Sequence, residues 1–136
     1  MKTKIAFCIQ LFFAGIFLLM FTSCENKNPD NPLLDTQWSG IAKIPMEKEI
    51  ILKFSKDKMD VVVENDVIES TLYAVKGDHI NFSKISGGSP CENGAKGVYT
   101  FEIIGDKLTI TTVTDECIAR TKSLKGGVYT KIDDIK

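Results

Sequence analysis

The sequence is poor in the side chains on which most catalysis and metal binding depend. Its 136 residues include one histidine, His79, and one tryptophan. A serine nucleophile of the triad type needs an imidazole base beside it, and a structural zinc site needs four ligands. His79 follows a predicted turn, where we expect it to face solvent. We therefore predict no catalytic residues, no metal and no cofactor, and we expect that the protein is not an enzyme.

The charge patterns that bind nucleic acid or phosphate are also missing. Lysines are scattered singly along the chain, and no glycine-rich loop precedes a predicted helix. Nucleic-acid binding needs a basic stripe, and a phosphate cradle needs such a loop. The neighbours Asp115 and Glu116 form a carboxylate pair in sequence only, because adjacent residues on a strand point to opposite faces. We therefore expect no nucleic-acid partner and no acid–base chemistry from this pair.

Charged side chains are absent from residues 5–21, an almost wholly apolar run that follows a basic start. A basic start, an apolar core and small residues before a cut site are typical of a secretory signal peptide. The stretch from Phe21 to Cys24, FTSC, resembles the lipobox of bacterial lipoproteins. That resemblance implies that residues 1–23 are removed as a signal peptide and that Cys24 is acylated, with palmitate as an expected chain. An ordinary secretory signal and an uncleaved membrane anchor are the alternatives.

The lipoprotein resemblance also predicts where the chain resides. Lipoproteins retained at the inner membrane often have Asp after the acylated cysteine, and this chain has Glu25. We therefore expect a lipid-anchored protein of the cell envelope, at the outer membrane rather than the inner one, on its periplasmic or surface face. Two or more acyl chains anchor a protein stably, whereas one chain binds marginally.

Cleavage would leave 113 residues, which is enough for one domain. The leader takes two lysines with it, so 15 basic residues would face 18 acidic ones, a net charge of −3. The segment after Cys24 is polar and rich in asparagine and proline, and such composition cannot bury a core. We predict a flexible tether over residues 24–34 and one folded domain over residues 35–136.

Two cysteines remain once Cys8 is lost with the leader and Cys24 carries lipid. They are Cys91 and Cys117, and an exported compartment favours a disulfide between them. A loop of this length would be stabilised by roughly 3 kcal/mol if the bond is unstrained. Two free thiols are the alternative.

Short alternating segments predict an all-β fold. Apolar residues recur with a period of two, as at Tyr99, Phe101 and Ile103. Asn65-Asp66 and Gly105-Asp106 are turn pairs that predict hairpins. The region 115–124 lacks alternation and predicts a helical turn or a crossing segment. The expected strands are 36–44, 49–54, 59–64, 67–75, 79–85, 97–104, 107–113 and 126–132.

Eight short antiparallel strands suit a closed up-and-down barrel or a sandwich, and closure removes the edges that invite aggregation. We predict the barrel. Its candidate interior or ligand-facing residues are Tyr73, Phe82, Tyr99 and Phe101. The short strands favour an interior filled by side chains over a ligand-sized cavity.

Three stretches, CENGAKGVY (91–99), GDKLTI (105–110) and DECIAR (115–120), resemble small bacterial lipocalin-like proteins of the calycin group. Their pattern runs C, G-x-Y, a hairpin, L-T-[IL] and then D-x-C-x-x-R before a final strand. The resemblance implies that Trp38, near the first strand, packs against Arg120 in a cation–π pair, which is worth about 0.5–2 kcal/mol. A competing resemblance is to META-type heat-shock lipoproteins, which also have an early tryptophan and two similar cysteine runs.

The function expected from these features is that of a membrane-anchored, lipocalin-like lipoprotein without chemistry of its own. It would bind a small apolar ligand or a protein partner. The alternative is a structural, assembly or inhibitor-like envelope lipoprotein with a filled barrel. The two differ in whether the barrel encloses a void.

Overall fold

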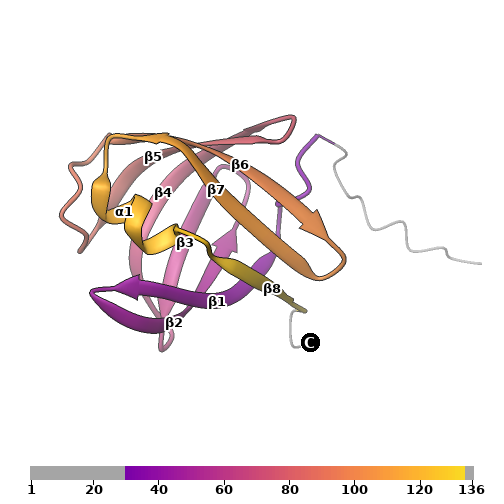
Figure 1. Cartoon of the computed structure of the whole chain (residues 1–136), viewed down its shortest axis with the longest axis horizontal. Helices are drawn as coiled ribbons and strands as arrows, with labels where there is room; N and C mark the ends of the chain where they lie inside the picture. Colours follow the sequence, from indigo (N-terminus) through magenta and orange to yellow (C-terminus); the bar gives the residue numbers. More distant parts are fainter. Residues whose placement is uncertain (1–29, 134–136) are drawn as a thin grey trace, which may run out of the picture.

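The computed structural model describes residues 30–133, which form a closed antiparallel barrel with one short helix (Figure 1). Each strand pairs with its neighbour in sequence, and the last strand closes the ring by pairing with the first. The predicted fold is confirmed. The elements are β1 (Gln37–Ile44), β2 (Met46–Phe54), β3 (Lys58–Val63), β4 (Asp66–Lys76), β5 (His79–Gly87), β6 (Lys96–Ile104), β7 (Lys107–Asp115), α1 (Ile118–Leu124) and β8 (Val128–Ile132).

The barrel forms because apolar residues alternate with polar ones along most of the strands. Tyr99 and Phe101 of β6 lie opposite Thr112 and Ile110 of β7, so these four side chains share one face of the sheet. Tyr99, Phe101 and Ile110 are all buried. A shift of one residue in this register would turn the apolar set to solvent, which fixes the pairing.

The β3–β4 turn lies one residue earlier than predicted. Its two central residues are Glu64 and Asn65, with φ of 51° and 78°, and both angles are positive as a type I′ hairpin requires. The expected centre, Asn65-Asp66, is wrong because Asp66 already pairs with Val63 as part of β4. The turn predicted at Gly105 is confirmed, between the paired residues Ile104 and Lys107.

One end of the barrel is closed by the chain segment that enters it. Leu33 is fully buried there, and Trp38 is 1% exposed. Asn31 donates from Nδ2 to the hydroxyl of Tyr73, which in turn donates to the carbonyl of Ser55 across the end of the barrel. The predicted tether therefore ends too late: residues 31–34 belong to the domain. Residues 24–29 of that tether and the predicted signal peptide lie outside the described residues.

The opposite end is built differently, because β8 is short. β8 pairs with β1 only over Gln37–Ser39 and with β7 only over Lys107–Thr109. Beyond those residues α1 packs against both strands and takes the place of a strand in the wall. Figure 1 shows α1 at the end of the barrel away from the N-terminal segment, which is drawn in indigo. The non-alternating region at 115–124 is thus a helix, one of its two predicted forms.

The ring of Tyr129 on β8 packs closely against the inner face of β1 at Gly40. A Cβ at Gly40 would overlap the ring of Tyr129, which is fully buried. Burial also raises the pKa of the Tyr129 hydroxyl to about 12. Glycine at this position therefore allows the closing strand to approach β1.

We expect the substitution Gly40→Ala to destabilise the fold by about 1–3 kcal/mol, because the added methyl group must displace a packed aromatic ring. Urea unfolding followed by circular dichroism would measure the loss. Gly88→Ala is the matched control, since a Cβ there meets no atom within 4 Å and should change stability by less than about 0.5 kcal/mol. Equal stability of the two variants would contradict this packing.

Candidate functional site

A buried ion pair lies at the helical end of the barrel, between the end of β7 and α1. The guanidinium of Arg120 donates to both carboxylate oxygens of Asp115, from Nε at 2.7 Å and from Nη2 at 2.8 Å. The Asp115 side chain is 0% exposed and that of Arg120 is 5% exposed. Nη2 also donates to the carbonyl of Ala95 at 3.1 Å. This two-bond geometry is specific to arginine, because only a planar guanidinium offers two parallel donors.

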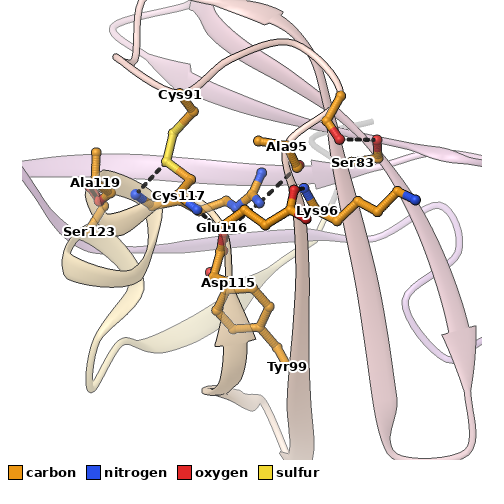
Figure 2. Close-up of polar contacts among 12 residues, drawn as sticks. Ser83, Cys91, Ala95, Lys96, Tyr99, Asp115, Glu116, Cys117, Ala119 and Ser123 are labelled. Atoms are coloured by element: carbon orange, nitrogen blue, oxygen red, sulfur yellow. Dashed lines mark hydrogen bonds and ion pairs between the residues drawn. A yellow bond between two sulfur atoms is a disulfide. The ribbon is translucent and has the colours of Figure 1, made fainter.

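Two further donors complete the surroundings of the carboxylate. The hydroxyl of Tyr99 on β6 donates to one oxygen of Asp115, and the backbone N–H of Cys117 donates to the other at 2.6 Å. Figure 2 shows Tyr99 directed at Asp115 from the neighbouring strand. A Cβ at Gly97 would lie 2.5 Å from the carboxylate, so glycine leaves room for it.

These contacts oppose the effect of burial on the carboxyl group. Burial by itself would raise the pKa of Asp115, but the donors from Arg120, Tyr99 and Cys117 hold the pKa below its usual range. Burial and the hydrogen bond to Asp115 together raise the pKa of the Tyr99 hydroxyl. Asp115 and Arg120 are therefore a charged pair at neutral pH, and Tyr99 keeps its proton.

The Cys91–Cys117 disulfide joins the β5–β6 loop to the start of α1, with 5.4 Å between the Cα atoms (Figure 2). The pairing predicted from the sequence is confirmed. The sulfur of Cys117 also accepts a bond from the N–H of Arg120 and caps the helix. From inside the barrel, Lys84 donates to the carbonyls of Ser89 and Cys91 at 2.9 and 2.8 Å. The loop is thus held from both sides.

A cavity of about 840 Å³ opens under α1 at this end of the barrel, and its lining is mostly apolar. Ligand pockets in proteins usually measure about 300–1,000 Å³. The structure therefore corrects the expectation of a barrel filled throughout: the interior is packed at the closed end and hollow beneath the helix. The lining residues are Ala42, Lys43, Pro45, Ile50, Met59, Val61, Ile68, Glu69, Gly88, Ser89, Pro90, Ala119, Arg120, Lys122, Ser123, Leu124 and Lys125.

The cavity exists because a helix replaces a strand in the wall. Strands pair at about 4.8 Å, whereas a helix with its side chains is about 10 Å wide. α1 therefore holds β1 and β7 apart above the short β8. Small residues contribute as well, since the inward positions that follow Trp38 on β1 are Gly40 and Ala42. The strands that face them carry Ile50, Met59 and Val61 at the cavity.

The four predicted interior aromatic residues lie inside the barrel but do not line this cavity. Tyr73, Phe82, Tyr99 and Phe101 are at most 9% exposed. Phe82 and Tyr99 pack with ring centres 5.2 Å apart, and none of the four lines the cavity. They are core residues, and contact between them and a ligand in the cavity has no support.

The predicted cation–π pair of Trp38 and Arg120 is wrong. Arg120 is held by Asp115 under the helix, while the indole of Trp38 is buried on β1 and donates to the hydroxyl of Thr36 at 2.8 Å. A lone buried guanidinium would need a counter-charge, and a carboxylate supplies it better than a ring face does. Asp115 and Arg120 both belong to the stretch DECIAR, on which the lipocalin-like resemblance rests, but the resemblance did not predict that they pair with each other.

His79 is exposed at the start of β5, as predicted, and its Nδ1 lies 2.7 Å from Asp78. In the part of the chain from residue 30 to residue 133, no group of three or more His, Cys, Asp or Glu side chains is placed to hold a metal ion. Over the same residues, no helix is both long and apolar enough to cross a bilayer.

No local pattern in the sequence indicated the cavity-lining residues, because they come from four strands, the β1–β2 turn, the β5–β6 loop and the segment of α1. The two small inward positions on β1, Gly40 and Ala42, are the signal that could have indicated a void beside them.

Comparison with models of protein families, with curated protein sequences and with solved structures found no match to this chain. The geometry of the site is therefore the evidence on function.

We expect the Asp115–Arg120 pair to make stability depend on pH. The pKa of Asp115 is lower in the folded chain than in the unfolded chain, so the stabilisation is complete above the unfolded value of about 3.9. It is lost as the pH falls through the folded value. Asp115→Asn should lower the free energy of unfolding by about 3–5 kcal/mol at pH 7, since Arg120 would lose its counter-charge.

Denaturant unfolding between pH 2 and pH 7 would measure both effects. The Asn variant should show a shallower fall in acid than the parent protein. Asp57→Asn, which changes an exposed carboxylate, is the control and should follow the parent curve. A parent and an Asp115→Asn variant with parallel pH curves would contradict the assigned pair.

Proposed function

We propose that this protein is a membrane-anchored, lipocalin-like lipoprotein without chemistry of its own, and that it binds a small, largely apolar molecule in the cavity under α1. The cavity is the observation that carries the proposal. It is of ligand size, it is lined mainly by apolar side chains, and it lies at the mouth of a barrel, where small-molecule sites often occur.

The placement of the chain within the barrel fits an anchored protein. Residues 31–36 enter at the closed end, and the cavity opens at the other end, under α1. Any anchor that precedes residue 30 therefore joins the barrel on the side away from the cavity. A ligand exchanging with the surroundings would not have to pass the attachment point.

The alternative function, that of a structural or assembly factor with a solid barrel, is supported by the packed half of the interior. Trp38, Phe54 and Tyr73 fill the closed end, with the rings of Phe54 and Tyr73 5.1 Å apart. The two functions make different predictions about the cavity, and a substitution that fills it separates them.

The substitution Ile68→Trp should block binding, because Ile68 is half-buried on β4 and lines the cavity. The full chain would be kept in bacterial membranes and exposed to decanol carrying a photoreactive diazirine group. Labelled residues would then be mapped by mass spectrometry of peptides. We expect the parent protein to be labelled at the cavity-lining segments and the Ile68→Trp variant to lose at least about 80% of that label.

Val67→Trp is the matched control. It adds the same ring one residue earlier on the same strand, but Val67 is 56% exposed and does not line the cavity. This variant should keep the label of the parent. Absence of label at the cavity in the parent protein, or equal label in the two variants, would refute small-molecule binding and favour the filled-barrel alternative.

The proposed anchor is tested by Cys24→Ala, which removes the only sulfur at the lipobox. Without acyl chains the protein should no longer pellet with membranes, since no other lipid attachment is proposed. Fractionation with an immunoblot would measure this, and Cys8→Ala, within the leader, is the control. Acylation of Cys24 would be contradicted if the Cys24→Ala protein stays in the membrane pellet and differs in mass from the parent only by the substituted side chain.

A further inference from the structure

We infer that the ligand of this cavity carries an anionic oxygen head group on an apolar chain, and that Arg120 with Ser89 recognises the head group. This inference rests on the proposed function and adds the chemical class of the ligand. It is carried by two unpartnered polar groups in the cavity lining and by the charges around the mouth.

The first observation is the free corner of the Arg120 guanidinium. Its Nε and Nη2 are bonded to Asp115, and Nη2 also to Ala95, but its buried Nη1 has no hydrogen-bond partner. The guanidinium is planar, so the Nε–Nη2 edge that faces Asp115 leaves the hydrogens of Nη1 directed away from that carboxylate. Arg120 lines the cavity. A buried cationic donor without a partner is costly, and a ligand oxygen would satisfy it.

The second observation is a neutral donor in the same lining. The hydroxyl of Ser89 is buried without a partner, and Ser89 lies in the loop that borders the cavity. The backbone carbonyl of Ser89 is fixed by Lys84, so the position of this residue does not depend on a ligand. A hydroxyl and a guanidinium N–H are both suited to a carboxylate or phosphate oxygen.

The third observation is the charge around the cavity. The lining contains four basic residues, Lys43, Arg120, Lys122 and Lys125, against one acidic residue, Glu69. Counting Asp115 as the partner of Arg120 still leaves an excess of positive charge. The chain as a whole has more acidic than basic residues, so this excess is local to the cavity. Such a mouth attracts anions and disfavours cations.

The apolar part of the lining indicates the chemistry of the ligand beyond its head group. Ile50, Met59 and Val61 form a floor of side chains that are at most 9% exposed. Contact with this floor stabilises a bound hydrocarbon chain by roughly 0.8 kcal/mol for each buried methylene group. A single-chain amphiphile with its anionic head beside Arg120 uses both halves of the cavity.

The test compares competitors that share one chain and differ in the head group. Labelling of the full chain in membranes by the photoreactive decanol would be competed with decanoate, decyl phosphate, decanol and decyltrimethylammonium near pH 8. The concentration that halves the label at the cavity is the readout. We expect an anionic competitor to act at a concentration at least about tenfold lower than decanol does, because hydrogen bonds to charged groups are the strong ones. The two anionic arms separate a carboxylate ligand from a phosphate ligand.

The variant Arg120→Lys tests whether Arg120 recognises the head group. Its ammonium group retains an ion pair with Asp115 but has no second N–H edge to offer a ligand. The advantage of an anionic competitor, which is the ratio of the half-effective concentration of decanol to that of the anion, should therefore fall at least about fivefold. Comparing ratios between variants cancels the different partitioning of the competitors into the membrane. Ser89→Ala serves as a second variant if Arg120→Lys does not fold, and it should reduce the advantage at least about threefold. Lys76→Gln, an exposed position that does not line the cavity, should leave the advantage unchanged.

The outcomes are distinct. Cavity label that decanol and the anions compete equally well, or that decyltrimethylammonium competes best, would overturn the anionic head group and leave the proposed function standing. An anionic advantage that is the same in the parent, in Arg120→Lys and in Ser89→Ala would overturn the assignment of the head-group site. Absence of cavity label in the parent, with no protection by any competitor, would overturn both proposals.

Discussion

The buried pair of Asp115 and Arg120 is the interaction on which the helical end of the barrel depends. Removing two charges from water is costly, and their attraction repays this only when the remaining donors and acceptors are also satisfied. Tyr99 and the N–H of Cys117 satisfy the carboxylate, and Ala95 accepts from the guanidinium. The pair therefore ties β6, β7, the β5–β6 loop and α1 to one point. Because it lies at the start of α1, it also fixes where the helix lies across the barrel.

The position of the helix determines the shape of the interior. At the closed end, strand-to-strand spacing brings large side chains into contact, and Trp38 and Tyr73 leave no room. At the other end, the wider helix keeps β1 and β7 apart, and Leu124 is its buried apolar contact with the interior. One barrel thus contains a packed core and a ligand-sized cavity. The disulfide and Lys84 hold the loop that forms one side of the mouth, so the cavity does not rely on a ligand to keep its shape.

Much of the fold could be predicted from local patterns. Alternation at Tyr99 and Phe101 indicated which face is buried, because the period of a strand is two residues. The cysteine count, together with the expectation of export, predicted the Cys91–Cys117 bond. Errors arose where neighbouring strands decide the result. The turn at Glu64 and Asn65 is set by the pairing of Val63 with Asp66, and asparagine alone could not show which of its neighbours shares the turn.

The candidate site was less accessible to prediction. Trp38 and Arg120 were expected to meet, and the structure gives each a different partner, Thr36 and Asp115. The sequence by itself determined the strand pattern and predicted the disulfide, because hydrophobic period and cysteine count are read directly along the chain. It left the barrel and the sandwich as alternatives, and the pairing of β1 with β8 decided between them. Only the tertiary structure decided the cavity and the free corner of Arg120. Both depend on distances between residues far apart in sequence: a void forms where a helix replaces a strand, and a donor is left over only once every neighbouring acceptor has been placed.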